Sequence, residues 1–143
     1  MPAGFGLPGA IIICGSIAGS TTIRDRKWVG YNASKCAILQ MTRSMACELG
    51  INGIRVNTLS AGQIQNGIVT STMKGKGLAD EWASRNTLGR LARLDEMRGV
   101  TVWLASDASS YCTGSEYVPA SISSKSSLTH MILFQHRSQW WLQ

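Results

Sequence analysis

The sequence has little charge, few aromatic residues and few prolines. Charged residues account for 15% of its 143 positions, aromatic residues for 7%, and there are 3 prolines, whereas apolar residues reach 44%. This balance excludes an intrinsically disordered chain and predicts one globular domain of ordinary size. A long apolar run is also lacking, because the longest covers only residues 10–14, and no basic segment precedes it. Such a run neither crosses a membrane nor resembles a signal peptide, so we expect a cytoplasmic protein.

Acidic residues are scarce. Eight Asp and Glu against 14 Lys and Arg give a formal net charge of +6, and an excess of basic residues can indicate nucleic-acid binding. Here the basic residues are scattered, with no run longer than Arg26-Lys27, and part of the excess lies near the C-terminus, where no acid follows Glu116. We therefore expect no nucleic-acid partner and rank nucleic-acid binding as the weakest alternative.

Paired cysteines are also missing. The four cysteines are Cys14, Cys36, Cys47 and Cys112; none forms a Cys-x-x-Cys motif and no histidine lies near them in sequence. A zinc site or a disulfide framework is therefore not expected, and we predict no metal. Three of the four lie in apolar stretches, where a cysteine typically behaves as a small buried hydrophobic residue.

The order of predicted elements indicates an α/β fold. The apolar, β-branched residues 10–14 predict a strand buried on both faces. Residues 31–49 predict a long helix, because Ile38, Met41, Met45 and Leu49 recur at helical spacing and Gly50 can end it. The remaining predictions are a strand at 54–59, helices at 78–86 and 95–105, and a strand at 116–118. This alternation is typical of a parallel sheet with crossover helices.

Tyr31 and Lys35 form the pattern with the clearest chemistry. Their spacing of four places both side chains on one face at the start of the predicted helix. A nearby ammonium group favours the ionised form of a phenol, and a tyrosine in that setting can pass a proton to or from a substrate oxygen. The motif alone also occurs on ordinary exposed helix faces. Ser16, just after the first predicted strand, lies where ligands commonly bind in parallel sheets.

The ordered series of motifs resembles the short-chain dehydrogenase/reductase family. The resemblance rests on Ser16-Ile-Ala-Gly19, then Tyr31-Asn-Ala-Ser-Lys35, then Ile54-Arg-Val-Asn57 followed by Gly62. Further similar segments are Leu88-Gly89-Arg90, the predicted helix of Glu96 with Trp103-Leu-Ala-Ser106, and Tyr111-Cys-Thr-Gly114. The resemblance implies a partial Rossmann-like, doubly wound parallel sheet with crossover helices. Within the family, the sequence is most similar to fungal members that act on sugars and polyols or to general reductases.

The resemblance also implies a function and the residues that perform it. The expected activity is NAD(P)-dependent oxidoreduction, in which hydride passes between a nicotinamide and a small carbonyl or alcohol substrate. Tyr31 would be the catalytic acid or base. Lys35 would assist it and bind the nicotinamide ribose, and Ser16 would orient the substrate oxygen.

A loop after the second predicted strand is implied to bind the cofactor. Its residues are Ala61, Gly62, Ile64 and Asn66, together with Tyr31 and Lys35 from the helix. Ala61 stands where the family usually has proline, and Asn66 where it often has threonine. The cofactor would be NADP or NAD, with NADP slightly favoured.

The sequence departs from the family pattern at both ends. Family members begin with a glycine-rich strand-turn-helix unit that holds the pyrophosphate, and this chain is expected to be truncated before its residue 1. The glycines of residues 4–9 fit G-x-G-x-x-G, but a strand follows them where a helix is required, so we reject that assignment. We expect a truncated domain at 1–118 and a divergent, poorly ordered tail at 119–143. An alternative function is therefore an inactive fragment that pairs with another subunit or forms a homo-oligomer through the helix at 31–49.

Overall fold

The computed structural model describes residues 9–22, 27–65 and 77–119, and it contains the parallel sheet that the sequence predicts. Three strands lie in the order β1 (Gly9–Cys14), β2 (Ile54–Leu59) and β5 (Glu116–Tyr117). β1 pairs with β2 in parallel from Gly9 opposite Ile54 to Cys14 opposite Leu59. β5 adds to the other side of β2, with Thr58 opposite Glu116. Among the described residues, no strand pairs with the outer edge of β1.

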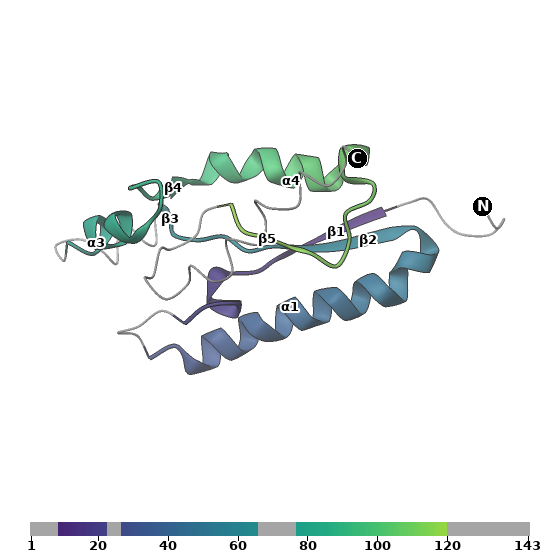
Figure 1. Ribbon diagram of the computed structural model, residues 1–143, viewed down its shortest axis with the longest axis horizontal. Helices are drawn as coiled ribbons and strands as arrows, with labels where there is room; N and C mark the ends of the chain where they lie inside the picture. The colour runs from purple at the N-terminus through teal and green to yellow at the C-terminus, as the bar shows by residue number, and fades with distance from the viewer. Residues whose placement is uncertain (1–8, 23–26, 66–76, 120–143) are drawn as a thin grey trace, which may run out of the picture.

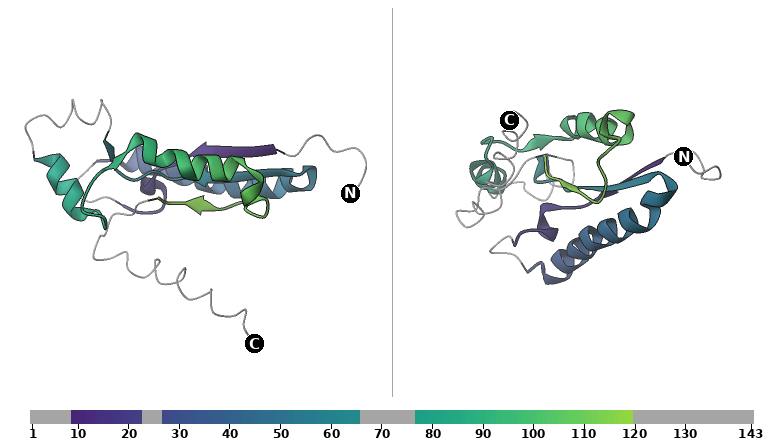
Figure 2. Two further views of the ribbon diagram at one scale, coloured as in Figure 1. Left: turned by 90° about the horizontal axis from the view of Figure 1, so that it is seen from above. Right: turned by 45° about the vertical axis from the view of Figure 1, so that its right-hand side comes forward.

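Helices cover both faces of this sheet, as a doubly wound fold requires (Figure 1). α1 (Val29–Leu49) lies along one face and contacts β2, whereas α4 (Arg98–Ala105) lies along the opposite face and contacts β1. The two further views in Figure 2 show the same layering. The α/β class and the Rossmann-like arrangement are therefore confirmed.

The buried side of α1 differs from its apolar repeat. Leu39, Thr42 and Ala46 are the buried residues of the helix, and the Thr42 hydroxyl hydrogen-bonds the hydroxyl of Thr58 on β2. Met41, a member of the apolar repeat, is 46% exposed. The repeat locates the helix correctly, but the buried side of the helix is formed by Leu39, Thr42 and Ala46, which are not members of the repeat.

Polar side chains of β2 hold the elements that follow it. The Arg55 guanidinium donates to the carbonyl oxygens of Leu104 (2.9 Å) and Ser106 (3.1 Å) and to the Ser109 hydroxyl (2.9 Å). These bonds satisfy carbonyl groups that the end of α4 leaves without helical partners. Asn57 is fully buried and donates from Nδ2 to the Cys112 carbonyl at 2.7 Å. Both side chains thereby fix the return of the chain into β5.

A second, smaller sheet was not predicted. β3 (Ile64–Gln65) pairs in parallel with β4 (Ala92–Arg93), and α3 (Leu78–Arg85) lies between them in sequence. The expected helix at 95–105 is divided into a 3-10 helix, Leu94–Met97, and α4. Other 3-10 helices are Ile17–Gly19, Gly50–Asn52 and Asp107–Ser109.

The expectation of buried cysteines is wrong. All four thiols are free; Cys14, Cys36 and Cys47 are exposed, and Cys112 is intermediate. Cys36 and Cys47 lie on the part of α1 that does not face the sheet, and Cys14 ends a strand with an open edge. No metal-binding group of three or more His, Cys, Asp or Glu is found within the described ranges. None of the helices in those ranges is both long enough and apolar enough to cross a membrane.

Candidate active site

The candidate site lies where the carboxyl ends of β1 and β2 meet the first turn of α1. Both strands run in the same direction, so the segments that follow them emerge at the same edge of the sheet. Figures 1 and 2 show that α1 begins at this edge, and that β3, β4 and α3 lie beside it. Ligands bind at this edge in open α/β sheets.

Ser16 is held at the start of the turn after β1. It is the N-cap of the 3-10 helix Ile17–Gly19, with extended backbone at φ −161° and ψ 149°. Its Oγ accepts a hydrogen bond from the Ala18 amide at 3.2 Å. Because the oxygen is the acceptor in that bond, the hydroxyl proton can be donated to another group.

Two glycines bring this turn close to its neighbours. A Cβ added at Gly19 would lie 2.7 Å from the Lys35 carbonyl oxygen, and one added at Gly15 would lie 2.6 Å from the Ser60 Oγ. Neither distance is compatible with a side chain unless a neighbouring group shifts, and at Gly19 that group is the backbone of α1. The turn that carries Ser16 therefore packs against the backbone of α1 on one side and the end of β2 on the other.

Tyr31 and Lys35 lie together in the first turns of α1. The Lys35 Nζ is 5.7 Å from the centre of the Tyr31 ring, and it donates to the Cys14 carbonyl oxygen at 3.4 Å. That carbonyl is two residues before Ser16, so the amine connects the helix to the strand that carries the serine. Tyr31 is 47% exposed, so its ring is accessible to a ligand. The Trp28 ring packs edge-on against the Tyr31 ring, with 5.8 Å between the ring centroids.

The predicted cofactor loop follows β2 and is held by its backbone. The Ser60 amide donates to the Tyr117 carbonyl at 2.9 Å, the Ala61 carbonyl accepts from the Ile17 amide at 3.3 Å, and the Gln63 carbonyl accepts from the Ala92 amide at 3.1 Å. Ala61, Gly62 and Ile64 therefore lie between the Ser16 turn and β4. Asn66 and the expected substrate-pocket residues 67–76 lie outside the described residues.

Three buried oxygens beside these residues have no hydrogen-bond partner among the described residues. They are Asn32 Oδ1, Ser60 Oγ and Gln63 Oε1. Buried polar atoms are normally paired, so such orphaned acceptors fit a polar ligand rich in donors, such as a carboxamide or ribose hydroxyls. Gln63 lies inside the predicted cofactor loop Ala61–Ile64, although no role was predicted for its side chain, and the oxygens of Asn32 and Ser60 were not predicted. The adjacency of Asn32 to Tyr31, and of Ser60 to that loop, was the only signal that could have indicated them.

Comparisons with known proteins agree with the fold. Residues 1–119 match the family model described as enoyl-(acyl carrier protein) reductase. D-arabinitol 2-dehydrogenase (ribulose-forming) of Candida tropicalis is 38% identical over 114 residues, which cover 78% of this chain and 40% of that protein. The chain therefore belongs to the short-chain dehydrogenase/reductase family, and it spans well under half the length of the curated relatives it matches.

Solved structures of dehydrogenases share the fold of this chain. A gluconate 5-dehydrogenase from Burkholderia cenocepacia J2315, in complex with NADP and tartrate, superimposes with a TM-score of 0.71 at 25% identity. That match covers 78% of this chain and 43% of the other. A 4-hydroxyisoleucine dehydrogenase complexed with NADH has a TM-score of 0.71 at 29% identity, over 78% of this chain and 45% of the other.

Proposed function

We propose that this chain forms the catalytic and nicotinamide-binding part of a cytoplasmic NAD(P)-dependent oxidoreductase. The observation that carries the proposal is the convergence of Ser16, Tyr31 and Lys35 at one edge of the sheet, with the Lys35 amine beside the Tyr31 ring and bonded to the Cys14 carbonyl. The substrate class is a small carbonyl compound or alcohol. The naming of a relative as an arabinitol dehydrogenase supports polyols and ketoses within that class.

Each residue of the cluster has a distinct task. The nicotinamide, when bound, supplies or accepts the hydride at the substrate carbon. In the reducing direction, Tyr31 gives its phenolic proton to the substrate oxygen, and in the oxidising direction it takes that proton back. Ser16 donates a hydrogen bond from its hydroxyl group to the same oxygen and thereby orients it. Lys35, whose amine lies beside the Tyr31 ring, assists the tyrosine and binds the nicotinamide ribose.

The segment after β2 is proposed to hold the nicotinamide. Ala61, Gly62 and Ile64 offer backbone groups to it, and Asn66 is proposed to extend the same site. The orphaned oxygens of Ser60 and Gln63 supply acceptors for ligand N–H and O–H groups. Related structures bind NADP in one case and NADH in another, and NADP remains the slightly favoured cofactor.

The proposal is tested by removing one hydroxyl group. Tyr31→Phe is expected to lower the rate of NADPH-dependent ribulose reduction by about 100-fold or more, because proton transfer loses its donor. The matched control is Tyr111→Phe, since Tyr111 is fully exposed in the loop before β5 and is 101% accessible. Circular dichroism should show the same fold for both variants. Wild-type turnover by Tyr31→Phe, or equal losses in the two variants, would contradict the assignment.

The open edge of β1 favours a second candidate, a subunit-pairing module without activity of its own. In the described part of the chain β1 is paired on one side only, and α1 exposes Val29 (84%) and Met41. A longer member of the family or a second copy could cover these surfaces, with α1 in the interface. Stable co-purification with a longer homologue, together with no reductase activity at any concentration, would favour this function over catalysis.

A further inference from the structure

The cofactor loop depends on β4 for one of its backbone attachments. Gln63 and Ile64 lie beside Ala92, through the Ala92 amide bonded to the Gln63 carbonyl and through the pairing of β3 with β4. Each strand of this pair has only two residues, and so short a ladder provides few hydrogen bonds of its own. Something outside the ladder must hold β4 in place.

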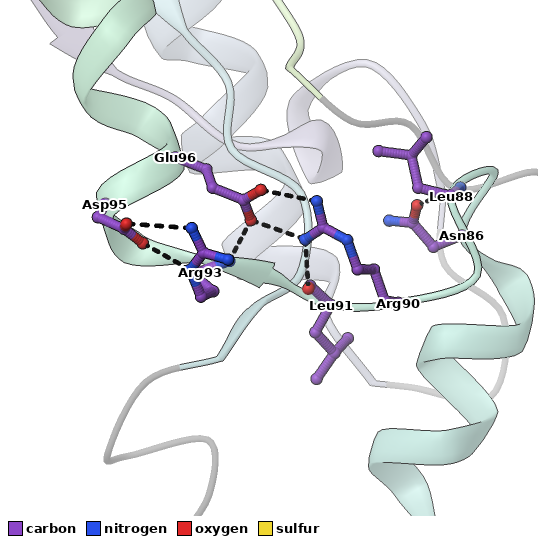
Figure 3. A network of polar contacts seen from close by, with 7 residues as sticks. All are labelled: Asn86, Leu88, Arg90, Leu91, Arg93, Asp95 and Glu96. Carbon is purple, nitrogen blue, oxygen red and sulfur yellow. Dashed lines mark hydrogen bonds and ion pairs between the residues drawn. The ribbon is translucent and has the colours of Figure 1, made fainter.

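Glu96 provides that attachment (Figure 3). Its carboxylate accepts from both terminal nitrogens of Arg90, at 2.7 Å and 2.6 Å, and from the Arg93 backbone amide at 2.8 Å. Arg90 Nη1 also donates to the Leu91 carbonyl at 3.2 Å. One carboxylate thus binds the chain on both sides of Ala92. We call these three bonds to Glu96 the Glu96 clamp.

The clamp is attached to a fixed part of the molecule. Glu96 lies in the 3-10 helix Leu94–Met97, which continues directly into α4. α4 contacts β1, and Arg55 from the central strand holds its C-terminal end through the Leu104 and Ser106 carbonyls. Glu96 therefore fixes the position of β4 relative to the main sheet.

The clamp differs from an ordinary surface ion pair. Exposed ion pairs between two side chains contribute little to stability. Here the arginine binds in the two-pronged geometry that fixes direction as well as distance, and one partner is a backbone amide. Arg90, followed by the Arg93 backbone amide, also lowers the pKa of Glu96 to about 2, so the carboxylate stays charged well below neutral pH. The neighbouring Asp95 makes only side-chain bonds, to Arg93 at 3.0 Å and 3.2 Å.

We infer that Glu96 is a positioning residue for the nicotinamide. Through Arg90 and the Arg93 amide it fixes β4, and through the β3–β4 pair it holds Gly62 to Ile64 in the orientation that receives the nicotinamide ring. This inference rests on the proposed function. Glu96 itself touches neither cofactor nor substrate, and it acts by ordering the segment that does.

The test compares two substitutions that remove the same charge from adjacent residues. Glu96→Gln removes the charge and one of the two acceptor oxygens of the clamp, so the two-pronged bond with Arg90 is lost, whereas Asp95→Asn removes an exposed ion pair and leaves the clamp intact. The first measurement is amide hydrogen exchange at Ala92, with the Gly15 amide, which donates to Leu59 in the main sheet, as the internal reference. We expect Ala92 to exchange about tenfold faster in Glu96→Gln, the scale of losing a hydrogen bond to a charged group, and Gly15 to be unchanged.

The second measurement is binding of nicotinamide mononucleotide, followed by ligand-observed magnetic resonance. Loss of a preordered site should weaken binding about threefold or more in Glu96→Gln, with Asp95→Asn at the wild-type value. Arg90→Gln should reproduce both effects, and the double variant of Arg90 and Glu96 should add little, because the two side chains act through one contact.

The outcomes separate this inference from the function on which it rests. Unchanged Ala92 exchange in Glu96→Gln, or an equal change in Asp95→Asn, overturns the clamp. Faster exchange with unaltered nicotinamide mononucleotide binding overturns the positioning role while leaving the proposed function in place. If the wild-type chain does not bind the probe at all, the proposed function fails, and the positioning inference fails with it.

Discussion

At the scale of single residues, Gly19 decides how closely Ser16 approaches the catalytic helix. Gly19→Ala would place a methyl group 2.7 Å from the Lys35 carbonyl oxygen, so the turn must move away from α1. We expect a loss of about 1–3 kcal/mol in the free energy of unfolding, the usual effect of forcing an extra carbon into a packed region. Urea denaturation followed by circular dichroism measures it.

Gly30 is the matched control for this substitution. It lies in the first turn of α1, and apart from its chain neighbours and the nearby backbone of the helix no described atom comes within 4 Å of a Cβ placed there. Gly30→Ala should leave stability unchanged or raise it by up to about 1 kcal/mol, because alanine loses less backbone entropy in a helix. Equal effects of the two alanines would show that the close approach at Gly19 does not constrain the turn.

At the scale of the elements, Arg55 determines where α4 ends. Its guanidinium reaches two carbonyls and one hydroxyl around the end of the helix, and lysine cannot reproduce that fork of donors. We expect Arg55→Lys to lower the free energy of unfolding by about 1–3 kcal/mol, since buried acceptors lose bonds to a charged donor. The measurement is chemical denaturation.

Arg43→Lys serves as the comparison for Arg55→Lys. Arg43 is exposed on α1 and makes one long contact, 3.4 Å to the Gln40 side chain. Its replacement should change stability by less than about 0.5 kcal/mol. If the two lysine variants unfolded at the same denaturant concentration, the bonds made by Arg55 would not be holding α4.

The same scale shows which elements the sequence could predict. A continuous apolar run located β1, and the bounds of β2 agree with the predicted 54–59. α1 was found two residues short, because its first turn, Val29 and Gly30, carries no apolar periodicity. β3 and β4 could not be found, since two residues show no alternation and their pairing joins segments far apart in sequence.

The sequence could predict only part of the candidate site, for a related reason. Family motifs bring Ser16, Tyr31 and Lys35 to attention, and the close packing of Gly15 and Gly19 explains the glycines that accompany the serine. Periodicity gives an apolar repeat but not which side of an element is covered. That is why the exposure of Met41 and Cys36 was missed. Arg90 and Glu96 lie in segments that resemble the family, but their pairing was not predicted, because charged residues at such spacings usually lie free on a surface.

At the scale of the whole molecule, the open edge of β1 is the feature that most favours self-association of this chain. Gly9 and Gly15 direct their amides to β2, so by alternation the backbone groups of Ala10 and Ile12 face the other edge. No described strand pairs with that edge. An unpaired edge of a β-branched strand is a template for another strand. We therefore expect the chain to self-associate as its concentration rises, which sedimentation velocity would detect.

A charge on the edge strand should suppress that association. Ala10 is exposed, so Ala10→Lys adds a cation beside the open edge without filling the core, and charged residues are a common protection for edge strands. Ser110→Lys adds the same charge at an exposed site far along the chain and should leave association as in the wild type. If both variants associated like the wild type, the contact would lie elsewhere, with the exposed Val29 and Met41 of α1 as the next surface to alter. If Ala10→Lys alone became monomeric, the edge of β1 would be the surface through which this chain meets its partner.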